Sequence, residues 1–321
     1  MSMHAALVRA FDHPPRYETY EIPEPAGRDE VLVDVLAVGL HPRVRTGAAG
    51  RHYTSTGELP MIPGIDGVGQ LPDGQSVYFV VPDDSWGSMA DKAVVNVRRT
   101  IPLPDRVDVT KLAAAMNPAM SAWVALRRRV PLQPGQSVLV LGATGNAGGM
   151  AVQVAKRLGA ARVVGAGRNP ERLAELSAIG ADEVVALVDD LAVTGERLAM
   201  AAAEVDIVID YLWGEPASTA MMALLQARSD RSRALDWVEI GAMAGPTIEL
   251  PSVALRSANL RLQGNGQGAV SPQAYLAELP SLVEEIDGGT IEVNARPVPL
   301  ANVEATWSTP EAPGVRTVLI P

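Results

Sequence analysis

Three glycines at every third position, Gly142, Gly145 and Gly148, follow the apolar run Ser137–Leu141 and open the amphipathic stretch Gly148–Leu158. Glycines in such a turn let the backbone bend tightly and bring its N–H groups close to a pyrophosphate, and the helix N-terminus that follows attracts negative charge. A glycine repeat by itself is often an ordinary turn. Here a strand precedes it, a helix follows, and a second strand–helix pair comes next, which is the context that the motif requires. The sequence therefore predicts a dinucleotide site.

The turn after the next apolar run, Arg162–Gly165, indicates which dinucleotide binds. Sites for NAD usually hold an acidic residue there, which binds the ribose 2′-hydroxyl. This chain has Arg168 and Asn169 in that turn and Arg172 one helical turn later. A guanidinium suits the oxygens of a 2′-phosphate, although both arginines could also be solvated residues at a helix start, where a cation opposes the dipole. We expect NADPH, held by Arg168, Asn169 and Arg172.

The elements around these turns favour an α/β fold. Apolar runs alternate with helical patterns from Ser137 to Leu262, which predicts a parallel sheet covered by helices on both faces. The first hundred residues instead carry short strand signals between turn formers, typical of a small barrel or sandwich. The tail adds a helix at Pro272–Glu285 and a last strand at Arg316–Ile320. The expected strands of the alternating segment are Ser137–Leu141, Arg162–Gly165, Glu183–Ala186, Val205–Asp210, Trp237–Ile240 and Asn259–Leu262.

Length and composition exclude several classes of protein. A chain of 321 residues exceeds the roughly 100–200 residues usual for one domain, so we expect two domains. A net charge of -10 argues against nucleic-acid binding, and the apolar runs are too short for a membrane helix. With 0 Cys the chain has no disulfide, cysteine nucleophile or thiolate metal ligand. Because no secretory signal is apparent, the expected location is cytoplasmic.

Several motifs in one order give the chain a family resemblance. It resembles the medium-chain dehydrogenase/reductase superfamily, specifically its zinc-free quinone oxidoreductase (zeta-crystallin-like) branch, and the resemblance runs nearly end to end. The motifs that carry it are Val38–Pro42, Pro63–Gly69, Gly87–Ala90, Ala113–Met116, Ser121–Trp123, Leu141–Gly149, Val205–Asp210, Val238–Ala242 and Gly314–Leu319.

The resemblance implies a GroES-like, β-rich catalytic domain over residues 1–120 and 268–321 and an inserted Rossmann NADPH-binding domain over residues 121–267. It also implies a homodimer joined through the strand Asn259–Leu262. Cofactor contacts are implied for the glycine turn, with the backbone of Asn146 and Ala147 at the pyrophosphate, and for residues lining the nicotinamide. The implied cofactor-binding residues, beyond Arg168, Asn169 and Arg172, are Ser121, Gly142, Thr144, Gly145, Asn146, Ala147, Gly148, Gly241, Ala242, Met243 and Asn265.

Metal-dependent members of that superfamily differ from this chain at their zinc ligands. They hold a catalytic zinc with a Cys near the position of Leu40 and a His where this chain has Ile65, and a structural zinc with four Cys. This chain has 4 His, and nothing in their spacing places three together. We expect no metal.

Two residues are candidates for contact with the substrate. His41 stands where the branch usually has Asn; it can donate a hydrogen bond and, unlike Asn, move a proton, or it can be a structural histidine. Tyr53 can donate to a substrate oxygen or be a surface aromatic. His52 and Trp123 are expected beside them. Glu239 and the arginines 127–129 are expected to face solvent.

These features predict an oxidoreductase that transfers hydride from NADPH to a small electrophile, a quinone or an α,β-unsaturated carbonyl, without a metal. A short-chain dehydrogenase is excluded because no lysine (Lys92, Lys111, Lys156) follows a tyrosine by four positions. A non-catalytic NADPH-binding redox sensor or a crystallin-like protein is the alternative that the sequence leaves open.

Overall fold

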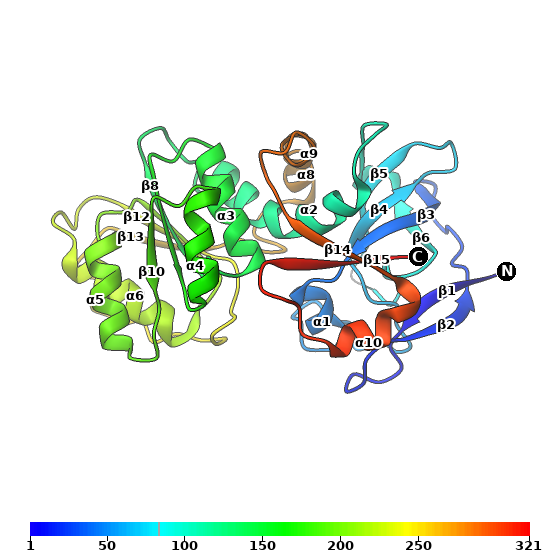
Figure 1. Ribbon diagram of the computed structural model, residues 1–321, viewed down its shortest axis with the longest axis horizontal. Coiled ribbons are helices and arrows are strands. Elements are labelled where there is room, and N and C mark those ends of the chain that lie inside the picture. The colour runs from blue at the N-terminus through cyan, green and yellow to red at the C-terminus, as the bar shows by residue number, and fades with distance from the viewer. Residues whose placement is uncertain (83) are drawn as a thin grey trace. The chain divides into compact units, whose positions relative to one another are not determined.

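The computed structural model describes residues 1–82 and 84–321, which divide into two units (Figure 1). One unit holds Met1–Asn117 and Leu279–Pro321, and the other holds Pro118–Glu278. The second boundary therefore falls later than the expected one at residues 267/268. A long-range contact accounts for this, because the Glu278 carboxylate pairs with Arg127 and Arg128 within the unit Pro118–Glu278.

A parallel sheet forms the centre of the unit Pro118–Glu278, as the alternating pattern predicts. Its order is β10-β9-β8-β11-β12-β13, so the first strand in sequence lies in the middle and the order reverses beside it. This is the strand order of the doubly wound dinucleotide-binding fold. The strands are β8 (Ser137–Leu141), β9 (Arg162–Gly167), β10 (Glu183–Ala186), β11 (Ile207–Asp210), β12 (Leu235–Glu239) and β13 (Leu260–Gly264).

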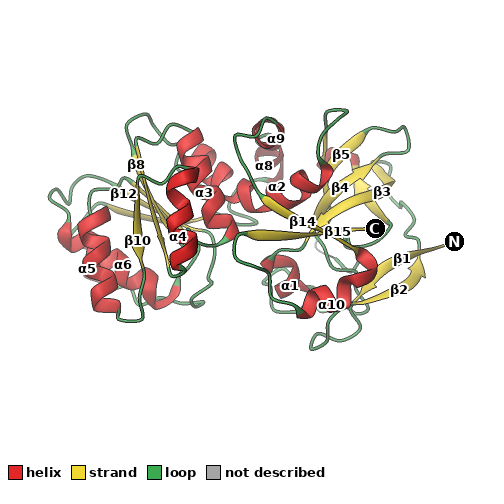
Figure 2. Cartoon of the chain, viewed as in Figure 1, coloured by secondary structure: helices red, strands yellow, loops and turns green. Residues whose placement is uncertain are grey.

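Helices flank this sheet (Figure 2). Three details differ from the expected helices: α5 (Leu191–Ala202) and the short α7 (Ser252–Arg256) were missed, and the expected helix Pro272–Glu285 is interrupted. The break lies at residues 277–278, and it fits Pro280, which has no N–H to donate to the carbonyl of Leu276 and stands in the first turn of the next helix, α9 (Leu279–Asp287). The helical segments are α3 (Asn146–Arg157), α4 (Pro170–Leu176), η3 (Ser177–Ile179), α5 (Leu191–Ala202), α6 (Gly214–Ala227), α7 (Ser252–Arg256) and α8 (Pro272–Leu276).

One long helix spans two stretches of the sequence that are rich in helix formers, Lys111–Met116 and Ser121–Arg129. Helix α2 (Val109–Val124) continues through Pro118 and ends in a π-helical turn, η2 (Ala125–Arg129). Its buried face is mostly alanine, leucine and methionine, which are strong helix formers and allow the helix to continue past the proline. The last three residues of this π-turn are the consecutive arginines Arg127, Arg128 and Arg129.

The other unit is built from both ends of the chain. Its main sheet has the order β14-β15-β3-β4-β5-β7, with β6 also paired to β3. The last strand joins β3 through Val318 opposite Gly39, so the C-terminus is part of the same sheet as the N-terminal strands. The strands are β1 (Ser2–Leu7), β2 (Arg16–Glu21), β3 (Glu30–Gly39), β4 (Asp66–Gln70), β5 (Ser76–Val80), β6 (Lys92–Asn96), β7 (Thr100–Pro102), β14 (Asn294–Pro299) and β15 (Val315–Ile320).

Short helices connect these strands, and an apolar core fills the unit. The core includes the fully buried side chains Leu7, Phe79 and Met89. In the described part of the chain, no helix combines the length and the apolar character that crossing a bilayer requires. The helical segments are α1 (Pro42–Ala48), η1 (Val97–Arg99), α9 (Leu279–Asp287), η4 (Leu300–Asn302) and α10 (Val303–Ser308).

Candidate functional site

The glycine turn connects β8 to α3 with very little space between them. Gly142 has φ of +86°, a conformation that favours glycine, and its N–H donates to Ala166 O at 2.9 Å. A Cβ on Gly148 would lie 2.1 Å from the carbonyl oxygen of Gly142. Only a glycine at 148 therefore lets the start of α3 approach the end of β8 this closely.

The remaining residues of the turn lie at the N-terminus of α3. Gly145 is the N-cap, and Asn146 and Ala147 begin the helix. Thr144 packs against the end of β9, because a Cβ on Gly167 would lie 2.4 Å from Thr144 Cγ2. The backbone N–H groups of a helix N-terminus and its partial positive charge favour an anion at this point. The carboxyl ends of β8 and β11, where the strand order reverses, are where such sheets bind ligands.

Arg168 and Asn169 follow β9 at the same end of the sheet. Asn169 caps α4, with its Oδ1 accepting the N–H of Arg172 at 2.9 Å. Arg168 is exposed and makes no hydrogen bond or ion pair with any residue in the described ranges 1–82 and 84–321. Arg172 pairs with Glu175, and its buried Nε has no partner in the same ranges. Arg168 is thus the arginine available to an anion at this turn.

A hydrogen-bonded cluster lies within the same unit, around Ser121. Its Oγ donates to Pro118 O at 2.8 Å and lies 2.8 Å from the hydroxyl of Tyr211. The side-chain Nδ2 of Asn265 donates to Ser121 O at 2.8 Å. Ser121 and Asn265 are both residues that the sequence predicts; Tyr211 was missed. The signal for it was its place directly after β11, at the carboxyl end of a parallel strand.

Tyr211 also lies against Gly142 of the glycine turn and against Gly241, which follows β12. A Cβ on Gly142 would be 3.3 Å from Tyr211 Cβ, and a Cβ on Gly241 would be 3.3 Å from Tyr211 O. The same oxygen accepts the N–H of Met243 at 3.2 Å, and Ala242 and Met243 are exposed beside it. Burial raises the pKa of Tyr211 far above its usual range, against the effect of the hydrogen bond to Ser121. Its phenol therefore stays neutral.

Asp210 holds the turn that carries Tyr211. Its Oδ1 accepts the N–H groups of Leu212 and Trp213 at 2.8 and 3.1 Å, and its Oδ2 accepts Trp237 Nε1 at 3.0 Å. Burial raises the pKa of Asp210, and the hydrogen bonds oppose that shift. Trp213 has φ of +50°, which costs energy for a non-glycine residue and requires restraint of this kind.

In the other unit, His41 belongs to a buried polar group with Asp66 and Tyr78. His41 Nε2 lies 3.2 Å from Asp66 Oδ1, and the Tyr78 hydroxyl donates to Asp66 Oδ2 at 2.6 Å. His41 Nδ1 is buried with no partner among residues 1–82 and 84–321. Burial lowers the pKa of His41 below its usual value, although the hydrogen bond to Asp66 acts the other way. A neutral imidazole that donates from Nε2 to a carboxylate leaves Nδ1 as an acceptor.

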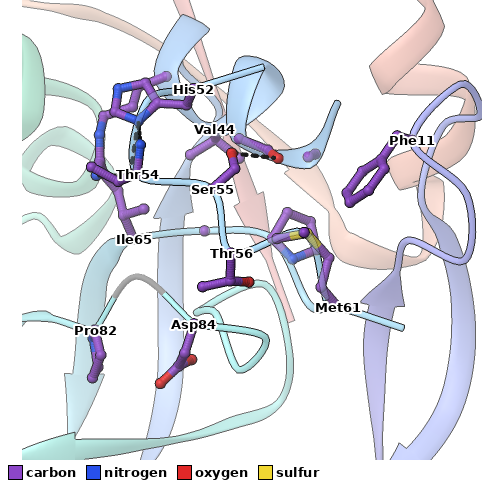
Figure 3. Close-up of a pocket in the computed structure, with 16 residues that line it drawn as sticks. Phe11, Val44, His52, Thr54, Ser55, Thr56, Met61, Ile65, Pro82 and Asp84 are labelled. Atoms are coloured by element: carbon purple, nitrogen blue, oxygen red, sulfur yellow. Dashed lines mark hydrogen bonds between the residues drawn. The ribbon is translucent and has the colours of Figure 1, made fainter. Parts of the chain in front are cut away.

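The other candidate, Tyr53, is exposed: 72% of its surface is accessible, and its ring centroid lies 4.4 Å from that of His52. His52 lines a pocket of about 40 Å³, with room for water-sized groups rather than a whole ligand. Figure 3 shows His52, Thr54 and Ile65 on one side of this pocket and Phe11 on the other. Neither His41 nor Tyr53 lines it.

Comparisons with known proteins agree with this geometry. The chain is 31% identical to a probable NADPH-dependent quinone reductase of Emericella nidulans, over 99% of this chain and 100% of that protein. It belongs to the medium-chain dehydrogenase/reductase superfamily, in its quinone reductase branch. Residues 147–275 match the family described as zinc-binding dehydrogenase.

Two further relatives extend the comparison. An NADPH-dependent alkenal/one oxidoreductase of Arabidopsis thaliana is 28% identical over 48% of this chain and 44% of that protein. The solved structure of a quinone oxidoreductase from Thermus thermophilus, also studied in complex with NADPH, superposes with a TM-score of 0.77 at 27% identity. The superposition covers 99% of this chain and 100% of the chain from Thermus thermophilus. The predicted fold, a GroES-like catalytic part and a Rossmann part, is confirmed.

The zinc sites of the superfamily's metal-dependent members find no matching donors here. Leu40 is fully buried, and Ile65 stands in the pocket wall. Over residues 1–82 and 84–321, no group of three His, Asp or Glu side chains is placed to hold a metal ion. With 0 Cys, the donor set does not fit the tetrahedral zinc sites of that superfamily.

One expectation about a side chain outside the site was wrong. Trp123, expected beside the substrate, is 2% exposed and donates from Nε1 to Glu278 O at 3.2 Å. Arg127 and Arg128 are exposed at the end of the helix, as expected, and both also pair with Glu278. Arg129 is partly buried and donates to Gly264 O and Ala269 O. Glu239 is only half-buried, and burial and the charge of Asp210 raise its pKa.

We predict that Gly148→Ala lowers the melting temperature by an amount equivalent to about 1–3 kcal/mol, because the new methyl overpacks against Gly142 O. Dinucleotide binding, measured by calorimetry, should fall with it. Gly145→Ala is the matched control: its Cβ would lie 3.4 Å from the same oxygen, an ordinary contact. Equal melting temperatures for the two variants would contradict the close approach of α3 and β8.

We also predict a pH effect of His41 on stability. The unfolded chain binds a proton at His41 below about pH 6.5, whereas the buried imidazole has a lowered pKa and resists protonation. The free energy of unfolding should therefore decrease as pH falls below that value, by up to about 1 kcal/mol from this residue at pH 5.5. In His41→Asn, the decrease measured by urea unfolding between pH 7.5 and 5.5 should be smaller.

The control for this measurement is His13→Asn, since His13 is exposed and pairs with Asp12 at the surface. Exposed ion pairs contribute little to stability, so this variant should unfold at nearly the same urea concentration as the parent at both pH values. If His41→Asn and the parent lose the same stability on acidification, the burial of a neutral His41 is refuted.

Proposed function

We propose that this chain is an NADPH-dependent oxidoreductase that reduces a quinone or an α,β-unsaturated carbonyl without a metal ion. The observation that carries the proposal is the Gly142–Gly148 turn, which brings the N-terminus of α3 to the carboxyl end of β8. The full-length relative described as an NADPH-dependent quinone reductase and the alkenal/one oxidoreductase support it. The names of these two relatives give different substrates, a quinone and an alkenal or enone, and both give NADPH as the cofactor.

The residues present fit NADPH. The close contact of Gly148 with Gly142 O brings the N-terminus of α3 to the carboxyl end of β8, where the backbone N–H groups of Asn146 and Ala147 favour a pyrophosphate. Arg168 and Asn169 would hold the 2′-phosphate, since an exposed guanidinium beside the end of β9 carries the matching charge. Ser121, Asn265 and the Gly241–Met243 backbone would hold the nicotinamide end. When bound, the cofactor supplies the hydride of the reduction.

Without a metal, side chains must hold the substrate oxygen as negative charge develops on it. Tyr53 is exposed and carries a phenol donor, and we propose it for this role. His41 suits a different role, because it is buried, neutral and fixed by Asp66. We propose that His41 orients the segment leading into α1 and does not deliver a proton.

We further propose a homodimer joined through β13. This strand forms an edge of its sheet, and the neighbouring helix α7 exposes Val253 and Leu255. An unpaired edge beside exposed apolar side chains favours strand pairing with a second copy.

For the cofactor, we predict that Arg168→Ala raises the dissociation constant for NADPH about 10- to 100-fold, the scale of a charge-assisted contact, and leaves NADH nearly unchanged. Calorimetric titration of both cofactors measures the difference. Arg28→Ala, which removes an exposed arginine of the other unit, is the control and should alter neither. Equal losses for NADPH and NADH would overturn the 2′-phosphate assignment.

The proposed activity is tested by a screen of NADPH oxidation over quinones, enals and enones, with product analysis. We expect steady turnover that survives exhaustive chelation, with a hydroquinone or a saturated carbonyl as the product. Tight NADPH binding without turnover of any electrophile would favour a redox sensor or crystallin-like role. Activity that chelation abolishes and zinc restores would overturn metal independence.

A further inference from the structure

Asn265 presents a hydrogen-bond acceptor that the described residues leave unused. Its Nδ2 donates to Ser121 O at 2.8 Å, which fixes the orientation of the amide, since a flipped side chain would point oxygen at oxygen. Its Oδ1 is buried and has no partner within residues 1–82 and 84–321. A buried acceptor without a donor costs free energy, so this atom requires a donor that comes from outside the chain.

Ser121, whose carbonyl accepts the bond from Asn265, presents a second acceptor on its side chain. A serine hydroxyl has one proton, and the Oγ of Ser121 donates it to Pro118 O at 2.8 Å. The hydroxyl of Tyr211, 2.8 Å from the same Oγ, must then be the donor of that contact. Burial raises the pKa of Tyr211, so the phenol keeps the proton that it donates. One lone pair of Ser121 Oγ remains, and the two other contacts fix its direction.

These two acceptors belong to residues that are themselves hydrogen-bonded to each other. They lie in the unit whose sheet carries the Gly142–Gly148 turn, at the ends of α2 and β13. A primary amide carries two N–H donors on one nitrogen, and adjacent acceptors match it. A methyl ketone of the same shape has no such donor. The two acceptors, Asn265 Oδ1 and Ser121 Oγ, can therefore bind a carboxamide but not the acetyl group that has the same shape.

We propose that Asn265 Oδ1 and Ser121 Oγ accept the two N–H groups of the nicotinamide carboxamide, and that Tyr211 is the positioning residue that aims Ser121. This inference rests on the proposed function, because it takes NADPH as the ligand. It adds Tyr211 to that site. It also says how the chain recognises the carboxamide, namely by two side-chain acceptors, which would fix the orientation of the nicotinamide ring.

The test compares binding of NADP⁺ with binding of its 3-acetylpyridine analogue, in which a methyl replaces the amino group. Calorimetry should show that the parent chain prefers NADP⁺ by about 5- to 100-fold, the scale of two hydrogen bonds. Ser121→Ala should reduce that preference about 2- to 10-fold. Tyr211→Phe, which keeps the buried ring and removes only the hydroxyl, should reduce it in the same direction.

Adenosine 2′,5′-bisphosphate, which lacks the nicotinamide, provides the control ligand. Both variants should bind it as the parent does, and Tyr17→Phe, which alters a tyrosine of β2 in the other unit, should leave all three ligands unchanged. A parent chain that binds NADP⁺ and the acetyl analogue equally would overturn the inference. So would variants that lose affinity equally for NADP⁺ and for the bisphosphate, since Tyr211 would then only support the fold. If the parent binds neither NADP⁺ nor the bisphosphate, the proposed function itself fails.

Discussion

The approach of Gly148 to the carbonyl of Gly142 is the constraint on which the candidate site depends. A methyl group at position 148 would be 2.1 Å from that oxygen, so α3 can start where it does only because the residue has no side chain. This contact places the positive end of a twelve-residue helix beside the carboxyl end of the central strand. Every other element of the site is arranged around that point, because the neighbouring parallel strands end at the same edge.

Four other strands of the sheet each lead into a residue of the candidate site at the same edge. β9 leads to Arg168, β11 to Tyr211, β12 to Gly241 and β13 to Asn265. The buried carboxylate of Asp210 accepts two N–H groups of the strained turn after β11 and a third from the Trp237 indole, which restrains that turn. The guanidinium of Arg129 donates to the carbonyl oxygens of Gly264 and Ala269, which lie before and after Asn265 in the chain, and so holds this loop. The site therefore rests on backbone and buried polar contacts within one unit, and little of it depends on flexible surface side chains.

Features that depend on local sequence were the ones that the sequence could predict. The glycine turn, β8 and β10 follow from spacing and apolar runs, and the structure has both strands at the predicted residues. Tyr211, the Asp66 partner of His41 and the pairing of Arg127 with Glu278 could not be predicted. Each joins residues far apart in the chain, so no local pattern encodes it.

Helix boundaries were predictable only in part, for a related reason. Pro118 is a helix breaker by its local preference, yet α2 continues through it because the flanking side chains are buried. The helix α5 was missed because Val193, Thr194 and Gly195 weaken its pattern, although Asp190 caps its N-terminus. Tertiary packing outweighs local propensity in both cases.

A crystal structure of the chain grown with NADP⁺ tests the central claim most directly, namely that the turn between β8 and α3 is a dinucleotide site. The account predicts that the pyrophosphate lies against the backbone of residues 142–147, with the 2′-phosphate at Arg168 and the nicotinamide at Ser121 and Asn265. A nucleotide bound elsewhere on the chain, with the Gly142–Gly148 turn empty, would contradict it.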